Sequence, residues 1–243
     1  MSNRSKFEPL SDDVCRNSQE SNVLIPKLIH GDIAIMPLFV CDAALFEEVR
    51  REVLAVIDDT EGELVGGDHP TYKFVSRVDP NWIPKPNAIH QHSLYNSKDD
   101  FVYFVDDHHW TSVSRRFNPK LTAVPKFFRK YFGESEMQNA RLQLIAGGGD
   151  LGQHREKIIA IPGREHNWKL RFHLPIITNP NVEFLMDGRK YKMATGTVYV
   201  FNQSCLHSVT NGGSELRIHL YWDYYLNDHI MINLLAPALK ASS

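Results

Sequence analysis

The second half of the chain reads as a succession of short β-strands, and this pattern constrains the fold more than any other feature of the sequence. Between residues 140 and 225, short apolar or alternating segments are separated by turn residues. Asp187-Gly188 lies between two such segments, and Asp-Gly is one of the strongest signals for a two-residue hairpin turn. The expected strands cover residues 141–145, 169–178, 182–186, 189–193, 197–201 and 216–225.

The first half of the chain predicts helices that flank this β region. Asp42 is expected to cap a helix. The apolar residues of that helix recur close to helical spacing, at Leu45, Val49, Val53, Leu54 and Ile57. A short strand is expected at 33–35, and a second helix over 119–132 that ends at Gly133. Helices on the N-terminal side of many short strands indicate a mainly β fold, a double-stranded β-helix (jelly roll, cupin-like) with flanking N-terminal helices.

The length of 243 residues favours one domain with an N-terminal elaboration. Residues 1–22 are rich in Ser, Asn and acidic residues and predict a disordered tail. Residues 23–243 are then a single jelly-roll domain, in which 23–139 supply helices and substrate loops and 140–225 form the β core. Residues 61–118 look irregular, as loops or lids near a functional site often do.

The charge and cysteine content exclude several classes of protein. The net charge is −2 and no basic run interleaves with aromatic residues, which argues against nucleic-acid binding. Three widely spaced cysteines without a CxxC pair indicate a reducing compartment and no disulfide framework. No signal peptide is visible, and the longest largely apolar stretch, 230–239, is too short to cross a membrane. We therefore expect a soluble, cytoplasmic protein.

Three residues offer metal-binding side chains in a suggestive order: His154, Glu156 and His207. Two histidines and one carboxylate, with coordination positions left open, form the facial site of non-haem Fe(II) oxygenases. On an extended segment, His154 and Glu156 point to the same face, and His207 would come from a neighbouring strand. In a chain with 12 histidines the spacing alone is weak evidence, and histidines in surface turns are the alternative.

The segments around these residues resemble the aspartyl/asparaginyl β-hydroxylase family. The resemblance rests on Arg171–Pro180 (RFHLPIITNP), Gly196–Asn202 (GTVYVFN), His207–Asn211 (HSVTN) and Arg217, ten residues after the second histidine. It covers about residues 140–225, whereas residues 1–139 show no comparable signature. The resemblance implies a jelly roll that binds Fe(II), 2-oxoglutarate and O2. Members hydroxylate Asp or Asn in proteins, free amino acids, carrier-bound amino acids or a lipid acyl chain.

The resemblance also implies roles for particular residues. His154 and His207 look like the two imidazole ligands of the metal. Arg217 looks like the partner of the distal carboxylate of 2-oxoglutarate, because a guanidinium offers a charged bidentate fork. Gln143 matches a polar residue that the family places near the same carboxylate.

Arg171 and His173 share one face of their expected strand and look like pocket residues that contact the cosubstrate or a substrate carboxylate. The alternative for both is a buried structural hydrogen-bond pair. Trp110 and Trp168 are candidates for the wall of a substrate cleft, with ordinary packing as the alternative.

Glu156 departs from the family pattern, in which small bacterial members usually carry Asp and animal protein hydroxylases lack the carboxylate. We expect Glu156 to be the third ligand, with the loop retreating to accommodate its extra methylene. Alternatively, Glu156 pairs with Arg155 or Lys157 and water takes the position. His166 is a rival for the first ligand, because the segment before it lengthens the usual spacing. We favour His154, since it follows the Gly-rich turn as in the family.

Other conspicuous residues have simpler interpretations. His108-His109-Trp110 and His90-Gln91-His92 are expected in polar loops rather than in a second metal site. Gly147-Gly148-Gly149 lacks the lysine of a phosphate-binding loop and predicts a turn. Cys205 is expected to fill space in the core.

The leading hypothesis is a dioxygenase that hydroxylates an unactivated C–H bond of an amino acid or similar small molecule, free or carrier-bound. Arg171 suits a substrate carboxylate, and the chain has no protein-interaction repeats. A retained carboxylate at Glu156 argues against halogenation. The alternatives are a protein Asp/Asn β-hydroxylase and a non-catalytic jelly-roll binding protein.

Overall fold

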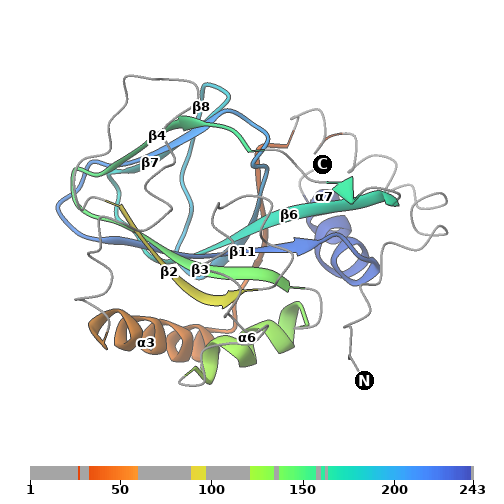
Figure 1. Cartoon of the computed structure of the whole chain (residues 1–243), viewed down its shortest axis with the longest axis horizontal. Coiled ribbons are helices and arrows are strands. Elements are labelled where there is room, and N and C mark those ends of the chain that lie inside the picture. Colours follow the sequence, from red (N-terminus) through yellow and green to blue (C-terminus); the bar gives the residue numbers. More distant parts are fainter. Residues whose placement is uncertain are drawn as a thin grey trace, which may run out of the picture.

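Two antiparallel β-sheets face each other in the computed structural model, and helices cover the outer face of the larger sheet (Figure 1). The structure describes residues 27, 33–59, 89–96, 121–133, 137–156, 160–161 and 164–241. The larger sheet contains, in spatial order, β1 (Ile35–Val40), β9 (Thr197–Phe201), β6 (Arg164–Ile177), β11 (Arg217–Tyr225), β3 (Met137–Ile145) and β2 (Ile89–Asn96), and β5 (Ala160–Ile161) pairs with β6. The smaller sheet contains β4 (Asp150–His154), β10 (His207–Asn211), β7 (Val182–Met186) and β8 (Arg189–Tyr191).

Eight of these strands have the topology of a double-stranded β-helix. Numbered from one to eight along the chain, they are β3, β4, β6, β7, β8, β9, β10 and β11. The sixth, third, eighth and first lie side by side in the larger sheet, and the second, seventh, fourth and fifth in the smaller sheet. The chain thus passes from one sheet to the other at every step except the hairpin from β7 to β8. The predicted jelly roll is confirmed, and β1 and β2 extend its larger sheet at the two edges.

The alternation of side chains along β11 decides which residues face which neighbour. The even-numbered residues Ile218, Leu220, Trp222 and Tyr224 belong to the main hydrophobic core together with residues of the two covering helices. The odd-numbered residues are Arg217, His219, Tyr221 and Asp223, and all four are buried. Because successive strand residues point to opposite faces, these polar side chains lie on the face turned toward the smaller sheet.

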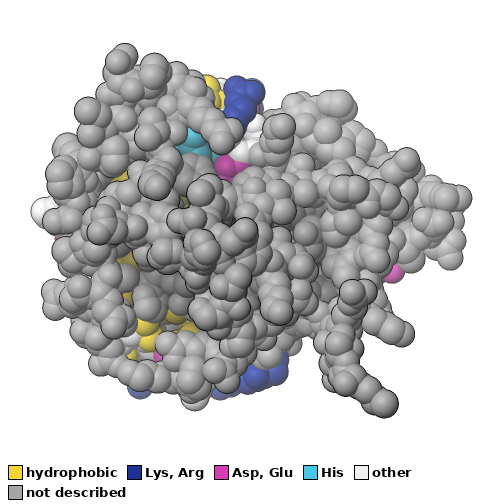
Figure 2. Space-filling model, in the orientation of Figure 1, with side chains coloured by type: hydrophobic (Ala, Val, Ile, Leu, Met, Phe, Trp, Pro, Cys, Tyr) yellow, Lys and Arg dark blue, Asp and Glu magenta, His cyan; other side chains and the backbone are white. Residues whose placement is uncertain are grey.

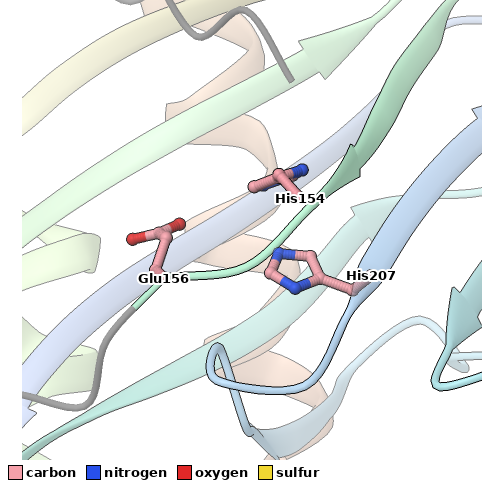
Figure 3. A group of neighbouring side chains, drawn as sticks. All are labelled: His154, Glu156 and His207. Atoms are coloured by element: carbon pink, nitrogen blue, oxygen red, sulfur yellow. The ribbon is translucent and has the colours of Figure 1, made fainter. Parts of the chain in front are cut away.

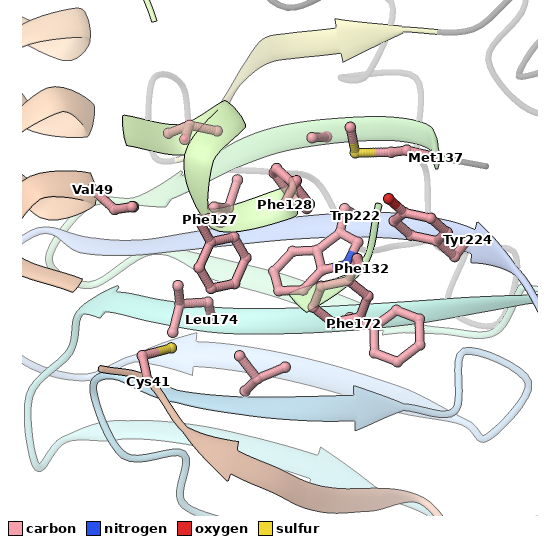
Figure 4. Packing of buried hydrophobic residues seen from close by; sticks show 14 of the residues in the cluster. Cys41, Val49, Phe127, Phe128, Phe132, Met137, Phe172, Leu174, Trp222 and Tyr224 are labelled. Carbon is pink, nitrogen blue, oxygen red and sulfur yellow. The ribbon is translucent and has the colours of Figure 1, made fainter. Parts of the chain in front are cut away.

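The main core is built from aromatic residues of the covering helix α6 (Ala123–Tyr131) and the larger sheet (Figure 4). Phe127, Phe128 and Phe132 meet the Trp222 ring edge-on at centroid distances of 5.6, 5.2 and 5.1 Å. Edge-to-face packing is a favourable geometry for aromatic pairs. It anchors the helical layer to β11 and so supports, from behind, the strand that carries Arg217.

The helices begin and end close to where the sequence predicts. α3 (Ala43–Asp59) starts after Asp42, whose Oδ1 accepts a hydrogen bond of 2.9 Å from the backbone N–H of Leu45. α6 starts at Ala123, where Glu52 of α3 accepts hydrogen bonds from the backbone N–H groups of Ala123 and Val124. α6 ends at Tyr131, and Gly133 two residues later has φ +76°, a conformation that favours glycine.

The hairpin predicted at Asp187-Gly188 is present. Both residues have positive φ, 43° and 78°, as a two-residue turn between twisted strands requires. Two other segments differ from the sequence prediction. The strand expected at 33–35 is β1, which starts only at Ile35. His90-Gln91-His92, expected in a polar loop, belongs to the strand β2 inside the region expected to be irregular. The helical segments η3 (Ile230–Leu235) and α7 (Ala236–Ala241) were not predicted.

Several expectations concern residues outside the described part of the chain. They are the tail 1–22, most of the irregular region 61–118, and His108-His109-Trp110. The division of the chain into these regions therefore stays a prediction. In the part that is described, no helix is both long and apolar enough to span a lipid bilayer.

Candidate metal centre

The pairing of β4 with β10 brings the two predicted imidazole ligands together. His154 is the last residue of β4 and His207 the first of β10, and the two stand opposite each other in the antiparallel register. Their ring centroids are 4.2 Å apart (Figure 3). Two residues 53 positions apart in the sequence thus meet because one backbone ladder joins their strands.

Glu156 completes the group from just beyond the end of β4. One potential ligand atom from each of His154, Glu156 and His207 lies within 4.8 Å of the other two, which is close enough to surround one metal ion. The backbone N–H of Glu156 donates a 2.7 Å hydrogen bond to the carbonyl of Gln203, which fixes the chain here. On the face shown in Figure 2, histidine and acidic side chains reach the surface next to each other.

Both imidazoles are oriented by backbone carbonyls. The Nδ1 atoms of His154 and His207 lie 2.8 Å from the carbonyl oxygens of Gly152 and Cys205. A carbonyl only accepts hydrogen bonds, so Nδ1 carries the hydrogen and the lone pair of each neutral ring is on Nε2. Burial and the neighbouring His154 lower the pKa of His207 to about 3, which favours the neutral, metal-binding form of that ring.

A buried charge network holds the Glu156 carboxylate. Arg171 donates from Nη1 to Glu156 Oε1 at 2.6 Å, and from Nε and Nη2 to the two carboxylate oxygens of Asp223 at 2.8 and 3.0 Å. Asn139 donates to Asp223 as well. Burial alone would lower the pKa of Arg171, but the carboxylates of Asp223 and Glu156 outweigh it and hold that pKa well above its usual value.

This network identifies the ion-pair partner of Glu156 and shows the surroundings of Arg171, two points on which the sequence had led to expectations. The ion-pair partner of Glu156 is Arg171 rather than Arg155, and Lys157 lies outside the described residues. Arg171 is buried, as expected of a pocket residue, but the structure pairs it with two carboxylates and not with His173.

The environment of Arg217 differs from that of Arg171, because no carboxylate of the described residues pairs with it. Arg217 is fully buried, and its Nη1 donates a 2.7 Å hydrogen bond to Gln143 Oε1, so the two residues expected to share a role do meet. Its Nε and Nη2 have no hydrogen-bond partner among the described residues. The guanidinium lies over the ring of Phe184, with the carbon Cζ 5.1 Å from the centroid. Burial lowers the pKa of Arg217 to about 9, because no carboxylate of the described residues offsets it.

Ring contacts connect this arginine to the metal-binding group through the interior between the sheets. The ring of Phe201 lies 4.8 Å from that of His207 and 4.7 Å from that of His173. His173 in turn contacts Phe184, which carries Arg217 on its face. The candidate ligands and the buried cation therefore line one continuous interior.

Two polar residues of this interior were missed from the sequence: Asp223 and His219. Both are fully buried on β11; His219 lies two residues and Asp223 six residues after Arg217. The signal that could have identified them is the polar residue at every second position of an otherwise apolar strand. Their partners could not have been identified in that way, because they come from the neighbouring strands β6 and β3.

Some candidates cannot be placed. Trp110 lies outside the described residues, and Trp168 and His166 belong to β6, but their side chains are not described. Their expected roles stay predictions. Cys205 is buried in the hydrophobic cluster between the sheets, and Gly147-Gly148-Gly149 forms the turn between β3 and β4.

Comparison with protein families gives a match over most of the chain. The family model described as aspartyl/asparaginyl beta-hydroxylase matches residues 46–226. No curated protein matches.

Several solved structures show distant similarity to the chain. A prolyl-4-hydroxylase from Pseudomonas putida is 12% identical, with 79% of this chain and 91% of that chain covered and a TM-score of 0.44. A 2OG-Fe(II) oxygenase family oxidoreductase from Burkholderia pseudomallei is 14% identical, with 59% and 72% covered and a TM-score of 0.36. A viral collagen prolyl hydroxylase from Paramecium Bursaria Chlorella virus-1 is 11% identical, with 56% and 78% covered and a TM-score of 0.35.

Proposed function

Because this chain belongs to the aspartyl/asparaginyl β-hydroxylase family over residues 46–226, we propose that it is an Fe(II)- and 2-oxoglutarate-dependent dioxygenase. Its substrate is an amino acid or an amino-acid-like molecule, free or carrier-bound, hydroxylated at an unactivated C–H bond. Membership extends the resemblance seen at 140–225 toward the N-terminus and supports a hydroxylase of the oxygenase type. One observation carries the proposal further: two imidazoles and a carboxylate share an interior with a buried guanidinium that has no carboxylate partner among the described residues.

The donor set fits Fe(II). Two neutral imidazoles and one carboxylate suit this ion and leave coordination positions for other ligands. His154 and His207 would bind through Nε2, since Nδ1 of each ring is turned to a backbone carbonyl. Glu156 would supply a carboxylate oxygen while Arg171 holds the group in place. The hydrogen bonds at Nδ1 fix the ring orientation, as partners of metal-binding histidines commonly do.

The surroundings of Arg217 fit a dicarboxylic cosubstrate. A buried cation without a counter-ion is unfavourable, and buried donors without acceptors cost free energy. A carboxylate placed against Nε and Nη2 of Arg217 would satisfy both donors and balance the charge. Gln143 would keep the guanidinium in plane through its bond to Nη1.

When bound, Fe(II), 2-oxoglutarate and O2 supply the oxidising chemistry, in which the oxo acid becomes succinate and CO2 and one oxygen atom enters the C–H bond. The side chains of the protein orient the bound groups and shield them from water. Phe184 and Phe201 line the interior between Arg217 and His207, and both rings are buried. Apolar walls exclude water, which strengthens the electrostatic contacts inside and limits side reactions.

The substrate is the least constrained part of the proposal. Arg171 already binds Asp223 and Glu156. A guanidinium has five N–H groups, and these three bonds leave two for a substrate carboxylate. Protein Asp or Asn residues remain the second candidate, because the family description names them.

Cosubstrate turnover tests the proposal. Purified protein supplied with Fe(II), O2 and 2-oxoglutarate should form succinate, and an amino acid that is the substrate should stimulate this at least several-fold. A panel of free amino acids and of Asp- or Asn-containing peptides, followed by mass spectrometry for a gain of one oxygen atom, separates the two substrate classes. Absence of any Fe-dependent succinate formation, with or without a candidate substrate, would favour a non-catalytic binding protein instead.

A further inference from the structure

His219 is a buried polar residue that the proposed function does not yet use. It lies on β11 two residues after Arg217 and therefore on the same face of the strand. In the neighbouring strand β3 its register partner is Gln143, the residue that accepts a hydrogen bond from Arg217. His219, Arg217 and Gln143 thus form a polar group on two adjacent strands, turned toward the interior between the sheets.

Phe184 of the opposite sheet places His219 beside Arg217. The guanidinium carbon of Arg217 lies 5.1 Å from the Phe184 ring centroid. The imidazole of His219 is stacked on the same ring at 5.6 Å with an interplanar angle of 29°. Both polar groups therefore lie against one apolar ring that cannot form conventional hydrogen bonds with either.

Four buried polar atoms of this group and of the adjacent His173 on β6 have no hydrogen-bond partner among the described residues. They are Nε2 of His219, Nε2 of His173, and Nε and Nη2 of Arg217. Most buried polar atoms in proteins are hydrogen-bonded, so such a concentration points to a polar ligand in the interior. Because these side chains include a guanidinium cation and no anion, and no described carboxylate pairs with it, that ligand is expected to be an anion.

The contact between His219 and His173 restricts where their hydrogens lie. The two Nδ1 atoms are 3.4 Å apart. Burial, and then the charge of Arg217, hold the pKa of both rings well below the usual value, so both are neutral. In a neutral pair that shares one Nδ1–H, the donor ring has a bare Nε2, and the acceptor ring must carry its hydrogen on Nε2. The pair can then offer a single Nε2–H donor to a ligand.

We propose that His219 is a further binding residue for the cosubstrate: it donates from Nε2–H to the distal carboxylate that Arg217 binds. His173 acts as the positioning residue that fixes this tautomer by donating from its own Nδ1. The inference rests on the proposed function and adds to it a neutral donor beside the cationic one. A carboxylate accepts from both, which satisfies three of the four unpaired atoms.

Binding of two metal chelators to the Mn(II)-loaded protein, measured by calorimetry, tests this role. 2-Oxoglutarate has a distal carboxylate, whereas oxalate chelates a metal and has none. His219→Phe should weaken 2-oxoglutarate binding about 10- to 100-fold, since a hydrogen bond to a charged group is lost. It should leave oxalate binding within about twofold of wild type. His229→Phe, the same change at an exposed histidine, is the matched control and should alter neither.

Each other result overturns the inference. Equal weakening of both chelators would show a merely structural role, and unchanged 2-oxoglutarate binding would show no role. His219→Gln introduces an amide N–H donor, so its affinity for 2-oxoglutarate should fall less than that of His219→Phe. If the Phe variant does not fold, His219→Gln provides the test in its place. If the wild-type protein binds oxalate but not 2-oxoglutarate, the proposed function fails together with the inference, whereas failure limited to the variants leaves the proposed function intact.

Discussion

Two buried arginines in this chain differ in the carboxylates around them, and the difference separates a structural role from a binding role. Arg171 has two carboxylate partners, and its pKa is raised. Arg217 has none among the described residues, and its pKa is lowered. A paired buried cation supports the fold, whereas an unpaired one reduces stability until a ligand arrives.

Replacing Arg217 should therefore separate stability from binding. Arg217→Met removes a buried, uncompensated charge while keeping an apolar side chain of similar length. We expect the free energy of unfolding of the ligand-free protein to stay the same or rise by about 1 kcal/mol, measured by urea denaturation. Binding of 2-oxoglutarate should weaken at least tenfold in the same variant. A large loss of stability would mean that Arg217 is a structural residue.

Asp223→Asn is the contrasting substitution. It leaves Arg171 buried without its bidentate carboxylate partner, so the free energy of unfolding should fall by about 3 kcal/mol or more. Urea denaturation measures this loss, and Glu183→Gln is the control. Glu183 pairs with Lys190 at the surface, where an ion pair contributes only ~0–1 kcal/mol. Equal effects of the two substitutions would contradict the network described for Asp223.

The lowered pKa of Arg217 gives the proposed cosubstrate site a pH limit. As the pH rises above the pKa of about 9, the ligand-free guanidinium loses its charge, so binding of a carboxylate weakens there. The affinity for 2-oxoglutarate should be constant from pH 7 to 8 and fall as the pH rises through about 9. Oxalate, measured alongside, corrects for changes at the metal. Parallel behaviour of the two chelators would exclude Arg217 as the cause.

At the scale of elements, the pairing of β4 with β10 creates the metal-binding group, and the turn before β4 controls that pairing. In this turn Gly147 lies close to the loop before β11: a Cβ atom would come within 2.7 Å of the Ser214 carbonyl oxygen and 2.8 Å of that of Gly213. Such a clash with backbone cannot be relieved by rotating a side chain. The turn was predicted from its glycines, but the approaching loop was not, because only the folded chain brings the two segments together.

Gly147→Ala should therefore disturb the metal site from seven residues away. We expect a loss of about 1–3 kcal/mol in the free energy of unfolding, together with weaker Mn(II) binding, because the start of β4 must shift. Gly133→Ala is the control. It strains a positive φ, but no atom of the described residues lies within 4 Å of the added Cβ, and Gly133 follows α6 on the outer face of the larger sheet. Its Mn(II) affinity should equal that of wild type.

Strand prediction succeeded where apolar residues alternate over a sufficient length and failed where they do not. β9 was predicted at its full extent, and the Asp187-Gly188 turn fixed the β7–β8 hairpin. β4 (DLGQH) and β10 (HSVTN) are five residues long and largely polar, so they were not expected from periodicity. They are strands because they pair with each other, and β10 also pairs with β7. This pairing joins segments that are distant in the sequence, so the local sequence of each strand does not predict it.

For the whole molecule, the jelly roll and its family could be predicted, but the connections within the site could not. His154, Glu156, His207, Arg217 and Gln143 were all named from the sequence, and the structure brings the first three together and pairs the last two. The ion pair of Glu156 with Arg171 and the contact of His219 with His173 depend on which strands become neighbours. Which charged side chains meet in the interior is therefore decided by the strand order, which local sequence does not reveal.

The central claim is that one cation binds between His154 and His207 while Arg217 holds the far end of 2-oxoglutarate. Anaerobic titration of the Fe(II)-loaded protein with 2-oxoglutarate tests it most directly, because chelation of the iron by the oxo acid gives a weak visible charge-transfer band. We predict that the wild-type protein develops this band to saturation and that His207→Ala, which removes one of the two imidazoles, does not. A folded wild-type protein that shows no band, or a His207→Ala protein that shows the same one, would contradict the account.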